Sequence, residues 1–189
     1  MKKWFAHWLL RRGGWKIEGK PPQDRRFVLI AAPHTSNWDL LYLLAFAAVF
    51  DLKVSWLAKH SLFHPPMGWV LRALGGIPIV RHKNSNVVDA MVEAFNGRPE
   101  LVLVVPTEGT RARVEYWKSG FYHIAVGAKV PIVPSYLDYG NKRGGFGPAI
   151  TPTGDLVSDM QYFREFYGDK LGKFPGLFGP VRLREEDKK

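Results

Sequence analysis

The feature that most constrains the fold of this chain is a series of short apolar runs separated by segments with helical periodicity. Five runs have the length of strands, and they cover residues 27–32, 54–58, 77–80, 101–105 and 132–136. Between several of them, apolar residues recur every three or four positions, as in 87–95 and 121–128. This alternation predicts an α/β fold, with residues 1–189 forming a single three-layer domain in which helices flank a mixed, largely parallel central sheet.

The two ends of the chain differ from this pattern. Residues 1–20 place a tryptophan-rich apolar stretch between two pairs of basic residues, which suits an amphipathic helix lying in a membrane interface. The same aromatic side chains could instead pack against the domain. The stretch is far shorter than the ~20 apolar residues of a membrane-spanning helix. Near the other end, residues 155–189 predict a helical segment rich in aromatic side chains.

A histidine and an aspartate, His34 and Asp39, follow the first apolar run and precede a helix expected over 40–50. A carboxylate that accepts a hydrogen bond from one imidazole nitrogen leaves the other nitrogen free to take a proton from a substrate hydroxyl. His34 is therefore a candidate general base, and Asp39 is its orienting partner. In the alternative interpretation, Asp39, Ser36 or Asn37 simply caps the helix and His34 is an ordinary loop residue.

A second polar turn follows the run 101–105. Its four residues of chemical interest are Glu108, Gly109, Thr110 and Arg111. The glycine permits a tight turn, the guanidinium suits a phosphate, and the carboxyl group can brace a cation or a hydroxyl. The run 77–80 also ends in an arginine, Arg81, so two guanidinium groups could converge on one phosphate dianion. In the alternative interpretation, these are structural turns that carry surface arginines.

Charge and composition narrow the classes of partner. The chain has 27 Lys and Arg against 17 Asp and Glu, so its formal net charge of +10 should attract anions. Anionic lipid headgroups, phosphorylated substrates, acidic carrier proteins and nucleic acids all fit this charge.

Cysteine is absent, which excludes disulfides, thiolate zinc sites and cysteine nucleophiles and makes the cytoplasm the default location. His60 and His64 lack the glutamate of a metalloprotease helix, so no metal site is expected.

Four blocks, taken in order, resemble the glycerolipid acyltransferase family, which includes the 1-acyl-glycerol-3-phosphate acyltransferases. The blocks are the histidine–aspartate pair at 34–39, a lysine-to-arginine stretch at 59–81, the glutamate–glycine–threonine–arginine turn at 108–111 with the following 117–120, and a two-proline apolar run at 130–134. One position departs from the family pattern, because Thr107 stands where the family usually has a proline.

The resemblance implies transfer of a fatty acyl group from a coenzyme A or acyl carrier protein thioester to a hydroxyl of a lysophospholipid such as 1-acyl-glycerol-3-phosphate. His34 and Asp39 would then be the general base pair, with no metal and no cofactor other than the thioester co-substrate. The implied substrate-binding residues are Arg81, Glu108, Gly109, Thr110 and Arg111, with Lys59 and Lys118 as further candidates. The implied location is peripheral, on the inner face of the cell membrane.

Two rival functions are weaker. A thioesterase could use the same base to activate water in place of the acceptor hydroxyl. A non-catalytic nucleic-acid-binding protein would fit the charge, but basic and aromatic residues are spread along the chain without zinc-finger spacing or an RNA-recognition signature. The chain also has no glycine-x-serine-x-glycine elbow, which excludes the usual serine hydrolase motif.

Overall fold

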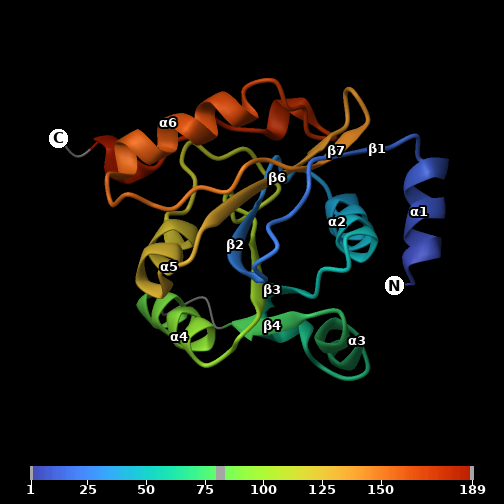
Figure 1. Ribbon diagram of the computed structural model, residues 1–189, viewed down its shortest axis with the longest axis horizontal. Coiled ribbons are helices and arrows are strands. Elements are labelled where there is room, and N and C mark those ends of the chain that lie inside the picture. Colours follow the sequence, from blue (N-terminus) through green and yellow to red (C-terminus); the bar gives the residue numbers. More distant parts are fainter. Residues whose placement is uncertain (1, 80–83, 188–189) are drawn as a thin grey trace.

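The computed structural model describes residues 2–79 and 84–187, and in this part of the chain seven strands form one sheet (Figure 1). The strands are β1 (Lys16–Glu18), β2 (Arg26–Ala31), β3 (Val54–Lys59), β4 (Gly76–Ile79), β5 (Leu101–Val105), β6 (Ile132–Asp138) and β7 (Arg143–Phe146). Their order across the sheet is β1-β7-β6-β2-β5-β3-β4. All neighbouring strands are parallel except β6 and β7, so the mixed, largely parallel sheet is confirmed.

Helices cover both faces of this sheet. They are α1 (Lys3–Arg12), α2 (Trp38–Val49), α3 (Met67–Ala73), α4 (Asn84–Asn96), α5 (Gly120–Ala128) and α6 (Leu156–Tyr167), with short 3₁₀ turns η1 (His60–Leu62), η2 (Pro175–Leu177) and η3 (Arg184–Asp187). In Figure 1, α4 and α5 lie on one side of the strands and α1 and α2 on the other. The three-layer arrangement expected from the sequence is therefore present.

The central strands are buried on both faces, as expected of parallel strands covered by helices. In β2, Val28 and Ile30 belong to the core that also contains residues of α4 and α5, whereas Phe27 and Leu29 belong to the core beneath α2. The five predicted apolar runs correspond to β2 to β6.

Strands β1 and β7 were not predicted, because neither has an apolar run. They pair through Gly145, whose backbone approaches Glu18 so closely that a Cβ atom on it would lie 1.7 Å from the Glu18 carbonyl oxygen. This pairing depends on backbone contact, so it leaves no hydrophobic pattern in the sequence.

Three neighbouring parallel strands carry their carboxyl ends to one edge of the sheet. Strand β2 pairs with β5 on one side and with β6 on the other. The turns that follow them, at 32–37, 106–119 and 139–142, therefore meet at this edge, which is where open α/β sheets bind ligands.

The C-terminal segment is helical only in part. Asp155 is the N-cap of helix α6, because its carboxylate accepts hydrogen bonds from the amides of Val157 and Ser158, and the helix ends at Tyr167. Beyond it the chain is mostly irregular, with the turns η2 and η3. Within the described residues, no helix has both the length and the apolar character needed to cross a membrane.

Candidate active site

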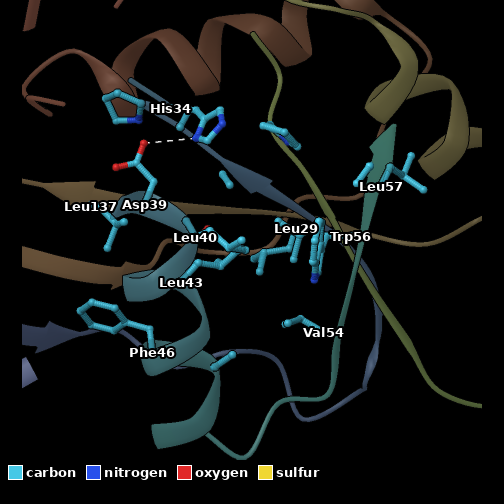
Figure 2. A pocket seen from close by; sticks show the side chains of 18 of the residues that line it. Leu29, His34, Asp39, Leu40, Leu43, Phe46, Val54, Trp56, Leu57 and Leu137 are labelled. Atoms are coloured by element: carbon cyan, nitrogen blue, oxygen red, sulfur yellow. Dashed lines mark ion pairs between the residues drawn. The ribbon is translucent and has the colours of Figure 1, made fainter. Parts of the chain in front are cut away.

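The candidate histidine and aspartate lie together at the start of α2. His34 Nδ1 is 3.2 Å from Asp39 Oδ2, as the dashed line in Figure 2 marks. The aspartate is buried, whereas 21% of the histidine side chain is exposed and the ring lines a cavity. Because Nδ1 faces the carboxylate, Nε2 is on the opposite edge of the ring. This is the geometry that a general base and its orienting carboxylate require.

Asp39 does not cap α2. The N-cap position belongs to Asn37, and the carboxylate of Asp39 turns back toward the preceding turn. Its Oδ2 accepts hydrogen bonds from the amides of Thr35 and Ser36, both at 2.9 Å. The backbone between the two residues is thus wrapped around the carboxylate, which fixes its position relative to the imidazole of His34.

Tyr139 supplies a further hydrogen bond to this carboxylate. It follows β6, and its hydroxyl donates to Asp39 Oδ1 at 2.8 Å. Burial, together with the charge of Asp39, raises the pKa of Tyr139, so the hydroxyl remains protonated and able to donate. Its ring packs edge-on to Trp15 at 5.0 Å and to Tyr42 at 6.1 Å.

Tyr139 was not predicted from the sequence. The available signal was its position, because it follows a buried strand just as His34 follows β2 and Glu108 follows β5. Side chains that follow the carboxyl ends of neighbouring parallel strands lie at the same edge of the sheet. The residue that follows β6 could therefore have been included among the candidate site residues.

Glu108 supports the turn at 32–37 that carries His34. Its Oε2 accepts a hydrogen bond from the His34 amide at 2.8 Å, and the side chain is only 1% exposed. Burial raises its pKa to about 7, opposed by the bond from the His34 amide and reinforced by the charge of Asp39. The sequence suggested that Glu108 braces a cation or a hydroxyl. The structure shows instead that it braces the backbone of His34.

The turn that carries Glu108 is built tightly. Gly109 adopts a φ of +68°, a region that favours glycine, and its amide donates to the carbonyl of Pro106 at 3.0 Å. Thr107, which replaces the family's usual proline, is fully buried, and its carbonyl accepts the Lys118 amide at 2.7 Å. A Cβ atom at Gly109 would lie 3.3 Å from Cγ of Lys118, so this lysine packs against the turn.

An apolar cavity of about 370 Å³ opens beside the histidine. Figure 2 shows Leu40, Leu43 and Phe46 following one another along α2 below the His34–Asp39 pair, opposite Leu29 of β2 and Trp56 of β3. We call this space the apolar cavity. Its volume lies within the range of about 300–1,000 Å³ that is usual for ligand pockets.

The structure brings most of the predicted site residues to this cavity. Those that line it are His34, Asp39, Lys59, Gly109, Thr110 and Arg111. Glu108 and Lys118 support its wall, whereas Arg81 lies outside the described residues. In the described part of the chain, no group of three or more potential ligands could hold a metal ion.

Comparison with known proteins places this site in a family. The model of the family described as Acyltransferase matches residues 15–138, which include the histidine–aspartate pair and the whole 108–111 turn. The chain therefore belongs to the acyltransferase family.

The chain is also similar to individual curated proteins of one name. A 1-acyl-sn-glycerol-3-phosphate acyltransferase of Limnanthes douglasii is 29% identical over 127 residues, which are 65% of this chain and 44% of the relative. The protein of the same name from Saccharomyces cerevisiae is 27% identical over 127 residues, covering 63% and 41%. The chain thus spans less than half the length of these curated relatives.

A solved structure has the same fold. The crystal structure of the 1-acyl-sn-glycerophosphate (LPA) acyltransferase PlsC from Thermotoga maritima superposes with a TM-score of 0.62 at 21% identity. The superposition covers 87% of this chain and 73% of the other. The shared architecture extends beyond the stretch that the family model matches.

Proposed function

We propose that this protein transfers a fatty acyl group from a coenzyme A or acyl carrier protein thioester to a hydroxyl of a lysophospholipid such as 1-acyl-glycerol-3-phosphate. The observation that carries the proposal is the placement of His34, held by a buried Asp39, at the wall of an apolar cavity. The names of the curated relatives support the choice of acceptor.

In the proposed reaction, Nε2 of His34 takes the proton of the acceptor hydroxyl as the oxygen attacks the thioester carbonyl carbon. Asp39 stabilises the imidazolium that forms. The tetrahedral intermediate then collapses with cleavage of the carbon–sulfur bond, and the imidazolium returns its proton to the leaving sulfur. The new ester and a free thiol are the products, and no covalent acyl-enzyme is needed.

The cavity wall suggests how the two substrates are accommodated. Leu29, Leu43 and Phe46 offer an apolar surface for a fatty chain, so its burial supplies binding energy away from the reacting carbonyl. Arg111 and Lys59 both line this cavity and add two cations to it. These cations suit the negatively charged parts of the substrates.

We further propose that the protein binds peripherally to the inner face of the cell membrane through α1. This helix packs on the domain through Ala6 and Leu10, while Trp4 and Trp8 remain 68% and 54% exposed. Basic residues at both of its ends suit anionic headgroups. A lipid acceptor would be available at that surface.

The test is acyl transfer by the purified protein and by a His34→Ala variant. We expect the wild type to convert a labelled acyl thioester and 1-acyl-glycerol-3-phosphate into the diacyl product, identified by mass spectrometry. His34→Ala should lower kcat by roughly 10²–10⁴-fold, the range for loss of a general base. His123→Ala, which removes an exposed histidine of α5, is the matched control.

Two outcomes would contradict the proposal. Release of free fatty acid that does not depend on an added acceptor would identify a thioesterase instead. Near-normal transfer by a folded His34→Ala protein would remove the histidine from the role of base.

A further inference from the structure

A second, polar hollow adjoins the candidate active site. It has a volume of about 290 Å³, and residues 35–38, Arg111, Lys173 and Phe174 line it. We call it the polar hollow. Asn37 and Arg111 line both the polar hollow and the apolar cavity, so the two spaces adjoin.

The segment that brings Lys173 to this hollow is hydrogen-bonded to the turn at 32–37, which carries His34. The Phe174 amide donates to Oγ1 of Thr35 at 3.2 Å, and the Tyr139 amide donates to the carbonyl of Leu171 at 2.8 Å. Gly172 packs so closely that a Cβ atom on it would lie 2.7 Å from Oγ1 of Thr35. The backbone on both sides of Lys173 is therefore positioned by the residues that also position Asp39.

Both cations of the polar hollow lack a carboxylate partner within residues 2–79 and 84–187. Lys173 Nζ lies 5.0 Å from the centre of the Trp38 ring and 6.0 Å from that of Phe174, and Arg111 makes no ion pair in the described structure. Other cations of this chain do pair, as Arg143 does with Asp138 at 3.2 Å. Two unpaired cations on one concave surface attract a multiply charged anion.

We infer that the polar hollow binds the phosphate of the acceptor lipid and that Lys173 acts with Arg111 as its second cationic ligand. This inference rests on the proposed function. A phosphate monoester carries a charge of about −1.5 to −2 at neutral pH, which two cations match. The guanidinium of Arg111 can bind two phosphate oxygens, and the ammonium of Lys173 adds a point charge.

The arrangement of the two spaces supports this assignment. The apolar cavity receives a fatty chain, whereas the polar hollow has hydroxyl, amide and cationic groups on its wall. Because Arg111 reaches both, a phosphate in the polar hollow and a hydroxyl near His34 can belong to one small glycerol headgroup. Lys173 lies outside the 15–138 stretch that the family model matches, so the four sequence blocks did not indicate it.

The experiment compares wild type with Lys173→Gln, which keeps much of the side-chain stem, and Lys173→Arg, which restores the charge. The Michaelis constants for 1-acyl-glycerol-3-phosphate and for acyl-CoA are measured separately, with 1-acylglycerol as the acceptor that lacks phosphate. Lys129→Ala is the matched control, because Lys129 follows α5 and precedes β6, at the opposite edge of the sheet. Thermal melting verifies that each variant folds.

We expect Lys173→Gln to raise the Michaelis constant for 1-acyl-glycerol-3-phosphate roughly 10- to 100-fold, the range for losing a hydrogen bond to a charged group. The preference for this acceptor over 1-acylglycerol should fall by a similar factor, and Lys173→Arg should recover most of it. Calorimetric titration with glycerol 3-phosphate should show weaker binding to Lys173→Gln than to wild type, without any need for turnover.

Three results would overturn the inference. An unchanged acceptor constant in an active Lys173→Gln protein would remove Lys173 from the site and leave the proposed function standing. A rise confined to the constant for acyl-CoA would assign the two cations to the coenzyme's phosphates. Equal binding of glycerol 3-phosphate by wild type and Lys173→Gln would exclude the phosphate contact, whether or not the wild type transfers an acyl group. An absence of acyl transfer by the wild type would instead count against the proposed function.

Discussion

At the scale of single residues, the raised pKa of Glu108 makes the stability of the folded protein depend on pH. The Glu108 pKa is raised to about 7 from an ordinary value of 4.5, so the native state keeps this proton to a higher pH than the unfolded chain does. At pH values between 4.5 and about 7 the native state binds more protons than the unfolded chain, so the free energy of unfolding falls as pH rises. In Glu108→Gln the side chain does not titrate, so the part of this fall in unfolding free energy that comes from Glu108, up to about 3 kcal/mol, should be absent.

The measurement is urea unfolding of wild type and Glu108→Gln at about pH 5 and about pH 8. The stability of the variant relative to wild type should increase with pH. Parallel pH dependence of the two proteins would show that Glu108 does not take up a proton on folding in this range.

In the proposed reaction, Tyr139 would act through Asp39, whose Oδ1 accepts its hydrogen bond. Tyr139→Phe keeps the ring between Trp15 and Tyr42 but removes the 2.8 Å hydrogen bond to the carboxylate. We expect kcat to fall about tenfold with little change in the Michaelis constants, because the imidazole is then held less firmly. Steady-state kinetics with both substrates would test this split. A rise in the Michaelis constants at unchanged kcat would assign Tyr139 to substrate binding instead.

At the scale of elements, α1 carries a prediction of its own. Replacing both Trp4 and Trp8 by alanine should weaken binding to anionic vesicles by roughly tenfold or more, because two large exposed aromatic side chains are lost from one helix. Sedimentation with vesicles measures this, and a double replacement by phenylalanine is the matched control. If the alanine variant sediments as the wild type does, α1 is not the membrane-binding element.

The elements also show what the sequence could predict. Strands β2 to β6 were predictable because each contains an apolar run of strand length, which is largely buried in β2, β5 and β6 and partly buried in β3. Helices α4 and α5 were predictable because their apolar residues recur with helical spacing. Strand β7, with the sequence Arg-Gly-Gly-Phe, has no such signal, and its place is fixed by backbone contacts with β1 and β6. Residues 168–183 lie after the helical pattern ends, so the return of Phe174 to Thr35, in the turn that carries His34, was not predictable.

At the scale of the whole molecule, the site is an assembly of segments distant in sequence. His34 and Glu108 were predicted because each ends an apolar run, but the hydrogen bond that joins them spans 74 residues. Tyr139 and Lys173 reach the same region from after β6 and from after α6. Sequence blocks therefore indicated the candidate groups His34, Asp39 and Glu108, and the contacts of Tyr139 and Lys173 with this region became visible only with the tertiary fold.

The cluster of Trp15, Tyr42 and Tyr139 rings has a practical consequence for dissecting this protein. Trp15 is the first residue that the family model matches, and Tyr139 is the first residue after that match ends. A fragment trimmed to the matched boundaries would contain all four sequence blocks and still lack the phenol that donates a hydrogen bond to the carboxylate of Asp39. A piece that keeps the whole hydrogen-bonded site is accordingly longer than the stretch that the family model matches.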